Sequence, residues 1–308
     1  MEIISGQFRL QEKYQNVSLA LGTFDGVHLG HRKIIERVVR AAEIQGGTSV
    51  VFTFDPHPRA VLQPELTLRL LMNNQEKRDV LTALDIDVLW MFPFHLDFSK
   101  LTPEEFVRDI LVAFICPELV VVGPNYTFGC EGRGTPEHLK ALGLKYGFRV
   151  EVVEPVYVGT QMVSSTIIRR LINNGEVAEA EKLLGRPFSI QGKVVSGDSR
   201  GRTLGFPTAN IEFPVSSVIP ADGVYAVWVL IDQAIYPGVA NIGSNPTFQT
   251  QHRRLEVHLL DFTADLYGQD IRVQFMEHLR GEMIFNNADE LIMQINKDIN
   301  KAQIILQS

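Results

Sequence analysis

Short apolar runs alternate with amphipathic segments over the first half of the chain. The apolar runs are VSLALGTF (17–24), TSVVFTF (48–54), DVLWMFPF (87–94), ELVVVG (118–123) and FRVEVVEPV (148–156). Their nearly continuous apolar content is typical of strands that are buried on both faces. This alternation predicts a parallel sheet flanked by helices, and such sheets bind ligands beyond the carboxyl ends of their strands.

Apolar residues recur at helical spacing between these runs. One stripe comprises Ile34, Ile35, Val38, Val39 and Ala42, a second Val80, Leu81 and Leu84, and a third Phe106, Ile110, Leu111 and Phe114. The third stripe follows Thr102-Pro103-Glu104-Glu105, which has the residue types of a helix start. We therefore expect one helix at each of these three stripes, between the predicted strands.

The pattern changes near residue 160. The segment SSTIIRRLINNGEVAEAEKLLGRPF (164–188) predicts two short helices that are separated at Asn173-Asn174-Gly175, and Gly185-Arg186-Pro187 ends the second helix. The later runs are IQGKVVSGD (190–198), GVYAVWVLID (223–232), YPGVANIGS (236–244), LEVHLLDF (255–262) and DIRVQFMEHL (270–279). They predict an antiparallel sheet or small barrel before a final helix over about 287–306. The expected domains are 1–185 and 186–308.

Composition narrows the class of protein. The chain has 308 residues, of which 45% are hydrophobic and 21% charged, and this suits two folded domains. A formal net charge of −7 gives no support to a nucleic-acid-binding protein. Cys116 and Cys130 are too few for a disulfide framework, and neither a signal peptide nor a membrane-spanning run is present in the sequence. We expect a cytoplasmic protein with no membrane association.

The stretch GTFDGVHLGH (22–31) joins the first predicted strand of the alternating series to the first predicted helix. Its glycines permit close backbone approach, and the N–H groups of a helix start favour a phosphate. The stretch has neither the Lys-Ser/Thr ending of a P-loop nor the G-x-G-x-x-G of a dinucleotide fold. Half of a zinc site, from His28 and His31, and ordinary turn chemistry are the alternatives.

The stretch GDSRGRTLGFPTANI (197–211) is the second candidate site. If its last residues are extended, Thr208 and Asn210 point the same way, because side chains of a strand alternate between its faces. A hydroxyl and an amide oxygen are hard ligands that Mg²⁺ accepts together with nucleotide phosphates. The alternative is a β-turn in which both side chains bind backbone groups.

An ordered series of motifs covers both halves of the chain. After GTFDGVHLGH come FTFDPHP (52–58), LLMNNQEK (70–77), FPFHLDFSKLTPEEFV (92–107), VVGPNYTFG (121–129) and SSTIIRR (164–170). The second half carries GFPTANI (205–211), GVYAVWV (223–229), GVANIGSNPTF (238–248), EVHLLDF (256–262), DLYG (265–268) and LRGEMIF (279–285). The chain resembles the bacterial bifunctional riboflavin kinase/FMN adenylyltransferases, also called FAD synthetases.

This resemblance implies a fold and two activities. The fold is an N-terminal Rossmann-like nucleotidyltransferase domain with a parallel sheet, then a C-terminal antiparallel β-barrel riboflavin kinase domain with a final helix. The barrel would phosphorylate riboflavin to FMN, and the N-terminal domain would transfer AMP from ATP to FMN, giving FAD and pyrophosphate. Mg²⁺ is the implied cofactor. The partners are the small molecules riboflavin, FMN and ATP, with no nucleic acid and no obligatory protein partner.

The resemblance also implies roles for individual residues. His28 and His31 would donate hydrogen bonds to the α-phosphate in adenylyl transfer, and Glu256 would be the base of the kinase. The adenylyltransferase ATP site would comprise Gly22, Phe24, His28, His31, Asn125, Ser164, Ser165, Thr166 and Arg169. Gly201, Thr208 and Asn210 would bind ATP in the kinase, the last two as metal ligands, and His57, Arg280 and Glu282 would contact flavin. Ile284 departs from the lysine that is more common in relatives.

Three other functions are compatible with parts of this pattern. In one, a single half is active and the other half supports it, but both motif sets are intact. In another, the chain binds flavin without turnover, which the presence of Glu256 and both histidines disfavours. A nucleotidyltransferase with a different acceptor, such as a pantetheine or nicotinate nucleotide, would leave the second domain unexplained.

Overall fold

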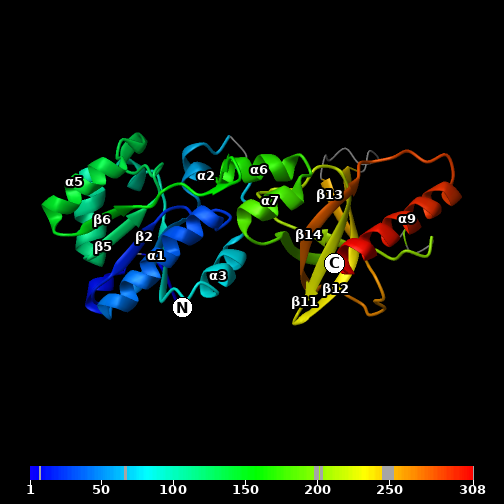
Figure 1. Ribbon diagram of the computed structural model, residues 1–308, viewed down its shortest axis with the longest axis horizontal. Coiled ribbons are helices and arrows are strands. Elements are labelled where there is room, and N and C mark those ends of the chain that lie inside the picture. The colour runs from blue at the N-terminus through cyan, green and yellow to red at the C-terminus, as the bar shows by residue number, and fades with distance from the viewer. Residues whose placement is uncertain (7, 66–67, 198–200, 202–203, 245–252, 308) are drawn as a thin grey trace. The chain divides into compact units, whose positions relative to one another are not determined.

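The computed structural model describes residues 1–6, 8–65, 68–197, 201, 204–244 and 253–307 (Figure 1). Its contacts divide the chain into two compact units. Unit 1 comprises Met1–Leu68 and Asn74–Ser164, and unit 2 comprises Arg69–Asn73 and Ser165–Ser308. Parts of the Gly/Arg loop (198–200 and 202–203) and of GVANIGSNPTF (245–248) lie outside the described residues.

Unit 1 contains the predicted parallel sheet. Its strands are β1 (Glu2–Ser5), β2 (Ser18–Leu21), β3 (Ser49–Asp55), β4 (Val88–Pro93), β5 (Leu119–Val122) and β6 (Arg149–Val152), in the order β1-β4-β3-β2-β5-β6. Every pairing within this sheet is parallel. The apolar runs predicted β2 to β6, whereas β1 is a short edge strand that the pattern did not indicate.

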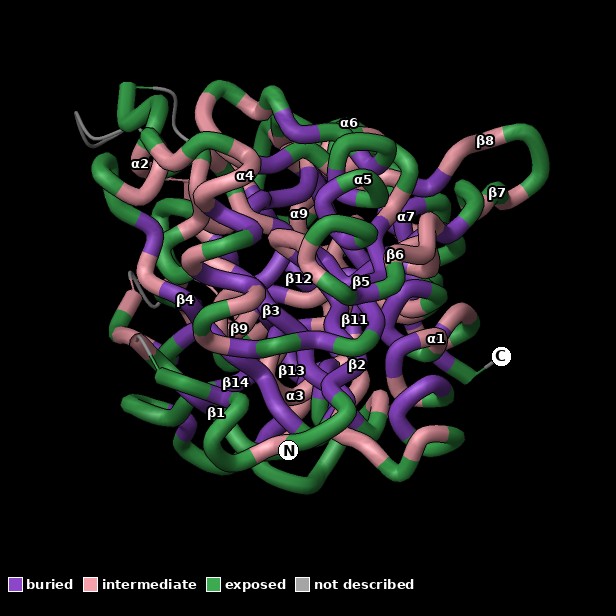
Figure 2. The backbone as a smooth tube through the Cα atoms, turned by 90° about the vertical axis from the view of Figure 1, so that its left-hand side faces the viewer, coloured by how far each residue is buried: buried purple, intermediate pink, exposed green. Residues whose placement is uncertain are grey.

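The central strands are buried on both faces, as their apolar sequences predicted. All residues of β2 and β5 are buried, and Figure 2 shows the buried backbone in purple. Leu19 and Leu21 belong to a core cluster that also contains Trp90, Phe106 and Leu139. Ala20 lies on the other face because strand side chains alternate, and α1 (Leu29–Gln45) packs against β2, β3 and β5.

The connections of unit 1 are mostly helical. Besides α1 they include α2 (Pro58–Leu62), α3 (Asn74–Thr82), α4 (Pro103–Glu105) and α5 (Pro136–Tyr146). The unit also contains the short 3₁₀ turns η1 (Leu10–Glu12), η2 (Phe98–Lys100) and η4 (Cys130–Gly132) and the hairpin strands β7 (Tyr157–Val158) and β8 (Gln161–Met162). Gly46 ends α1 at a φ of 58°, a left-handed conformation that favours glycine.

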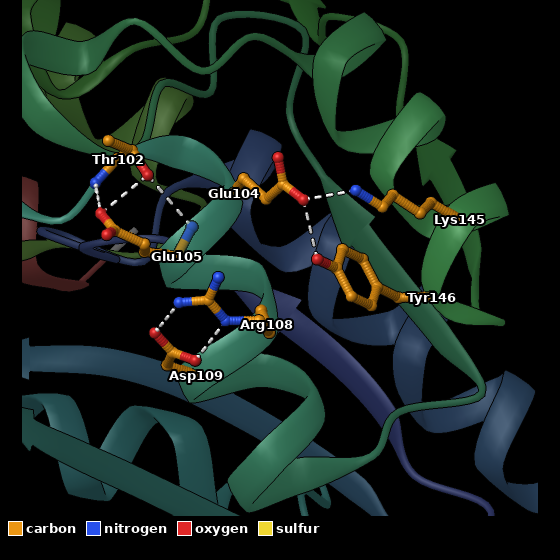
Figure 3. A network of polar contacts seen from close by, with 7 residues as sticks. All are labelled: Thr102, Glu104, Glu105, Arg108, Asp109, Lys145 and Tyr146. Carbon is orange, nitrogen blue, oxygen red and sulfur yellow. Dashed lines mark hydrogen bonds and ion pairs between the residues drawn. The ribbon is translucent and has the colours of Figure 1, made fainter.

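The predicted helix after Thr102 begins as expected but continues in an unusual form. Thr102 and Glu105 form a capping box, in which each side chain binds the other residue's backbone N–H (Figure 3). From Phe106 to Ile115 the chain is a π-helix, η3, which supplies Phe106, Val107, Ile110, Leu111 and Ile115 to the core. Figure 3 also shows Glu104 bound to Lys145 and Tyr146 of α5, which ties the helix start to its neighbour.

Unit 2 contains a closed antiparallel barrel, which confirms the prediction for the second half. Its strands are β9 (Phe188–Val195), β10 (Ala209–Glu212), β11 (Gly223–Ile231), β12 (Ala234–Ser244), β13 (Arg253–Leu259) and β14 (Asp270–Arg280), in the order β10-β13-β12-β11-β14-β9. Pairing of β9 with β10 closes the barrel. The final helix, α9 (Ala288–Gln307), packs against β11, β12 and β14.

Two short helices precede the barrel, as predicted. They are α6 (Ser165–Asn173) and α7 (Val177–Leu184), and Gly185 ends α7 at a φ of 72°. The compact units divide at Ser164–Ser165 rather than near Gly185, because α6 packs on α7 and α7 packs on β9 and β14. The boundary between 185 and 186 stays a prediction of where the two activities separate along the sequence.

Candidate functional sites

The stretch 22–31 lies at the switch point of the sheet in unit 1. From β2 the chain continues through α1 to β3 on one side, and from β5 it continues through α5 to β6 on the other side. The carboxyl ends of β2 and β5 are therefore neighbours whose connections run in opposite directions. Ligands of open α/β sheets bind at such a point. The turn after β2 and the turn that carries Asn125 after β5 both begin here.

The turn between β2 and α1 has a strained backbone. Phe24 and Val27 have φ angles of 48° and 37°, and Gly26 has a φ of 84°. Left-handed conformations of residues other than glycine cost roughly 1–3 kcal/mol each and persist where surrounding contacts determine them. Phe24 is fully buried, and its ring meets that of His31 edge-on at 5.2 Å. Phe24 thus supports His31 from within the protein, and its ring is not exposed to a ligand.

His28 and His31 form a stacked pair at the start of α1. Their ring centroids are 3.6 Å apart at an interplanar angle of 14°. His28 is the N-cap of α1, because its Nδ1 accepts a hydrogen bond from the backbone N–H of His31 at 3.2 Å. This hydrogen bond assigns the proton of a neutral His28 ring to Nε2. Nε2 is then the nitrogen that can donate to a phosphate oxygen.

His31 is an electrically neutral partner of this pair at neutral pH. Burial holds the pKa of His31 well below its usual value, and its interactions with His28 and Lys77 lower it further. Within the described residues, its Nδ1 is buried and has no hydrogen-bond partner. Two stacked imidazoles that both carried a charge would repel each other, so this arrangement favours one neutral ring.

Lys77 of α3 reaches the same turn, and sequence reasoning assigned it no role. Its Nζ donates a hydrogen bond to the backbone carbonyl of Thr23 at 2.9 Å. Its pKa is lowered because burial disfavours the ammonium, while Asp25 and Asp55 act in the opposite direction. The only signal in the sequence was its place at the end of the LLMNNQEK motif, since a lysine on a helix is ordinarily exposed.

The other predicted residues of unit 1 lie in turns that follow its strands. Asn125 is exposed in the turn after β5, and Ser164 is partly buried at the end of the unit. His57 caps α2, with its Nδ1 accepting from the backbone N–H of Arg59 at 3.2 Å. Gly22 is packed against the ring of Phe24, which a Cβ atom would approach to 3.1 Å.

The remaining residues assigned to the same ATP site belong to unit 2. Ser165 and Thr166 open α6, and Arg169 follows one turn later on the same helix. The Arg169 guanidinium donates from Nε to the backbone carbonyl of Arg69 at 2.9 Å, and this bond also lies within unit 2. The role of this segment in binding ATP stays a prediction.

The barrel brings Asn210 and Glu256 together. Asn210 of β10 is directly opposite Glu256 of β13 in the antiparallel register. Such pairs have Cβ atoms about 4.5–5.5 Å apart and share one face of the sheet. The flanking residues Leu255 and Val257 point into the barrel and are fully buried, so Glu256 and Asn210 lie on its outer face.

Thr208 and Gly201 complete this cluster. A Cβ atom on Gly201 would come within 3.4 Å of Thr208 Oγ1 and would overlap the carbonyl of Phe206. A Cβ atom on Gly197 would overlap the side-chain amide of Asn210. The backbone at Gly197 and at Gly201 therefore lies close to Asn210 and Thr208, which were predicted to bind ATP and Mg²⁺.

Arg280 has a partner that the sequence did not indicate. Its guanidinium binds the carboxylate of Asp298 on α9, with Nε–Oδ2 and Nη2–Oδ2 distances of 2.9 Å. It also donates to the carbonyl of Gly281 and lies over the ring of Phe285. Glu282 is exposed, and a Cβ atom on Gly243 of β12 would lie 2.5 Å from its Oε1. Flavin contact by Arg280 and Glu282 stays a prediction.

The donor set on the barrel fits a hard metal ion. Thr208 and Asn210 offer a hydroxyl and an amide oxygen, which are ligand types that Mg²⁺ takes together with phosphates, and the Glu256 carboxylate lies opposite Asn210. In the described part of the chain, His, Cys, Asp and Glu side chains form no group of three or more that could hold a metal ion. His28 and His31 therefore have no third ligand of these types among the described residues.

None of the helices in the described residues is both long enough and apolar enough to cross a lipid bilayer.

Comparisons with known proteins match each half of the chain to a protein family. The family described as FAD synthetase matches residues 10–167, and the family described as riboflavin kinase matches residues 184–306. A solved structure named as the macrolide-efflux protein of Streptococcus pneumoniae superposes with a TM-score of 0.88 at 34% identity, covering 98% of this chain and 99% of that chain.

Curated relatives share nearly the full length of the chain. The protein of Listeria monocytogenes is 39% identical over 92% of this chain and 90% of its own length. Those of Bacillus subtilis and Escherichia coli are 37% identical, covering 95% and 97% of this chain and 93% and 96% of their own lengths. All three are named bifunctional riboflavin kinase/FMN adenylyltransferase. The chain belongs to the family of bifunctional riboflavin kinase/FMN adenylyltransferases.

Proposed function

We propose that this protein catalyses two successive ATP-dependent reactions. The barrel half converts riboflavin and ATP to FMN and ADP, and the N-terminal half converts FMN and ATP to FAD and pyrophosphate. The observation that carries this proposal is the presence of an FAD synthetase match and a riboflavin kinase match, one after the other, in a single chain. Relatives that bear both activities in their names align over both halves.

In adenylyl transfer, an oxygen of the FMN phosphate attacks the α-phosphorus of ATP. The new O–P bond forms as the bond from the α-phosphorus to the β-phosphate oxygen breaks, and pyrophosphate leaves. The attacking oxygen is already anionic, so the protein has to align the two phosphates and neutralise charge. The stacked histidines at the switch point of the sheet suit that task.

His28 donates from Nε2 to the α-phosphate, and His31 acts as a neutral ring beside it. The hydrogen bond from the His31 backbone to His28 Nδ1 supports this assignment, because it leaves the proton on Nε2. Gly22 allows close backbone approach, and Asn125 contributes an amide from the neighbouring turn. The β- and γ-phosphates are bound by Ser164, Ser165, Thr166 and Arg169. Hydroxyl groups and a guanidinium at a helix start are good hydrogen-bond donors to phosphate oxygens.

In the kinase reaction, the 5′-hydroxyl of the riboflavin side chain attacks the γ-phosphorus of ATP, and ADP leaves. Glu256 accepts the hydroxyl proton as that bond forms. Thr208 and Asn210 hold Mg²⁺, which would neutralise charge on the nucleotide phosphates when bound. The direct pairing of Asn210 with Glu256 across β10 and β13 supports a shared site for base and metal ligands.

The flavin contacts are assigned to three residues. His57 serves the adenylyltransferase from the start of α2, and Glu282 serves the kinase from the segment after β14. Arg280 contacts the flavin from the end of β14, where its guanidinium is held by Asp298 and Gly281. Both reactions take place in the cytoplasm, where ATP is available, and neither requires a protein partner.

Separate inactivation of the two halves tests this function. Purified full-length protein is incubated with Mg²⁺, ATP and either riboflavin or FMN, and flavins are resolved chromatographically. We expect wild type to form FMN and then FAD. His28→Ala should form FMN and almost no FAD, and Glu256→Gln should not use riboflavin but should convert supplied FMN to FAD.

Matched substitutions at exposed positions of the same units provide controls. His138→Ala on α5 and Glu212→Gln on β10 should leave both reactions near wild-type rates, because both side chains are exposed. Unchanged FAD synthesis by His28→Ala would contradict the phosphate role of the histidine pair. A wild-type protein that forms only FMN would have a single activity.

A further inference from the structure

Lys77 is a lysine in an environment that ordinarily excludes lysines. It lies on α3, only 6% of its surface is exposed, and the negative charges of Asp25 and Asp55 act on its ammonium group. Burial of an ammonium group is unfavourable unless nearby groups compensate for the lost water. Burial also lowers the pKa of Lys77. A buried cation beside a functional turn calls for a reason beyond stability, since a hydrophobic residue of similar volume often stabilises a core as well.

Lys77 and a residue of a second element both donate a hydrogen bond to the same backbone atom. The carbonyl oxygen of Thr23 accepts from Lys77 Nζ at 2.9 Å and from Thr53 Oγ1 at 3.0 Å. Thr53 is fully buried on β3, whereas Lys77 comes from α3. A carbonyl oxygen has two lone pairs, so both are used at this position. The two donors anchor the start of the turn from two different directions.

The anchored atom directly precedes the strained part of the backbone. Phe24 follows Thr23 with a φ of 48°, and Val27 with a φ of 37° comes immediately before His28. Conformations of this kind persist only when their surroundings determine them. Thr23 and His28 are thus the two ends of one constrained turn. Its first carbonyl is fixed by Lys77 and Thr53, and its last residue caps α1.

A shift of the turn would move the imidazole of His28. His28 is held by its cap bond to His31 and by ring stacking at 3.6 Å, so both rings follow the backbone of the helix start. Electrostatic stabilisation of a phosphoryl transition state depends on donors that are already in place. A misplacement of about 1 Å can lower a rate about 100-fold.

We propose that Lys77 is a positioning residue for adenylyl transfer, which holds the Thr23–Val27 turn and thereby the His28 imidazole in the conformation that the reaction requires. This inference rests on the function proposed above. In this role Lys77 acts through the Thr23 carbonyl, which accepts its hydrogen bond. Its loss therefore affects the rate of the chemical step more than the binding of FMN or ATP.

Steady-state kinetics of full-length variants test this role. Lys77→Met removes the ammonium and keeps a chain of similar length, Lys77→Arg keeps a cationic donor, and Thr53→Val removes the second donor to the same carbonyl. We expect Lys77→Met to lower kcat for FAD formation from FMN by at least about tenfold, with KM for FMN and ATP within about threefold of wild type. Lys77→Arg should recover part of the lost kcat, and Thr53→Val should lower kcat with the same unchanged KM values.

The control is a lysine on the same unit that is exposed to solvent. Lys140→Met on α5 should leave kcat and KM for both reactions unchanged. Thermal unfolding of each variant gives the folded fraction at the assay temperature. If Lys77→Met does not fold, the positioning role is judged from the kcat and KM of Thr53→Val and from the activity of Lys77→Arg. Each of these substitutions alters a hydrogen bond to the Thr23 carbonyl and keeps a side chain of similar size in place.

Two different failures are distinguishable. Wild type that forms no FAD from FMN would overturn the proposed function itself. The positioning role alone would be overturned if wild type forms FAD and a folded Lys77→Met variant has the same kcat. The same conclusion would follow if only the KM values of that variant rise. Activity that falls only in proportion to the folded fraction would show that Lys77 is structural, and this too would overturn the inference.

Discussion

The ion pair between Arg280 and Asp298 joins the end of β14 to α9 and is nearly buried. The Asp298 carboxylate accepts from Arg280 Nε at 2.9 and 3.2 Å and from Gln294 Nε2 at 2.8 Å. The exposed fractions of the two side chains are 18% for Arg280 and 6% for Asp298. Asp298→Ala would remove the acceptor and leave the guanidinium without its carboxylate.

The expected destabilisation follows from this burial. Breaking a buried ion pair by removing one partner costs about 3–5 kcal/mol. The lower limit applies here, because Arg280 keeps some exposure and its bond to the Gly281 carbonyl at 2.9 Å. A loss of about 3 kcal/mol corresponds to a fall in Tm of roughly 6–12 °C for a unit of this size.

Tryptophan fluorescence can follow unit 2 separately. The chain has two tryptophans, Trp90 in the sheet and Trp228 on β11 of the barrel, where Trp228 packs on the cluster that α9 completes. In a Trp90→Phe background the remaining signal reports unfolding of the barrel unit. We expect Asp298→Ala to lower the Tm in this background, whereas the double variant Arg280→Met/Asp298→Met should be less destabilised because no charge is left unpaired.

Two results would refute this reasoning. A fall of less than about 2 °C for Asp298→Ala would mean that the pair contributes no more than an exposed salt bridge does. A double variant as unstable as Asp298→Ala would mean that lost packing, and not the unpaired guanidinium, accounts for the effect. Gln294→Ala, which removes only the neutral donor to Asp298, is the matched control and should lower stability by about 1 kcal/mol.

Two further predictions concern the candidate sites. The folded-state pKa of His31 lies below the usual 6.5, so the unfolded chain binds more protons as the pH falls below about 6.5, and stability falls by at most about 1.4 kcal/mol per pH unit from this group. His31→Gln should flatten this dependence when Trp90 reports unfolding in a Trp228→Phe background, and a slope equal to that of wild type would contradict the assignment. Gly197→Ala should displace the Asn210 amide and lower FMN formation about tenfold without changing FAD formation from supplied FMN; unchanged FMN formation would argue against a metal or ATP role for Asn210.

The sequence predicted elements wherever burial leaves a continuous pattern. Strands β2 to β5 were found because their residues are mostly apolar and buried. Strand β6 was found from its apolar run, but it is a partly exposed edge strand and not buried on both faces as expected. The barrel strands were found because short apolar runs recur between turn residues. The edge strand β1 was missed because Ile4 is its only buried residue. Helix α5 was missed because its buried stripe is small, and β10 because it has only four residues. The π-helical form of η3 has no signature in the residue pattern.

The candidate sites were predicted less completely, because side-chain partners depend on tertiary structure. The pairing of Asn210 with Glu256 depends on the register of β10 on β13, which spacing along the chain does not define. The buried ion pair of Arg280 joins positions that are 18 residues apart, and sequence reasoning assigned Arg280 to flavin alone. In the sequence Lys77 resembles an ordinary exposed lysine of a helix. Only the structure shows that it is buried and donates to the Thr23 carbonyl.

The short segment Arg69–Asn73 limits how this protein can be dissected. It packs with unit 2 although the residues on both sides of it belong to unit 1, and Leu70 exchanges backbone hydrogen bonds with Ser216 and Val218. The chain therefore passes between the units more than once. A single truncation near residue 185 would separate Leu70 from both of its hydrogen-bonding partners. Unlike a pair of domains joined by one linker, this chain cannot be divided by one cut into two fragments that each keep all their native neighbours.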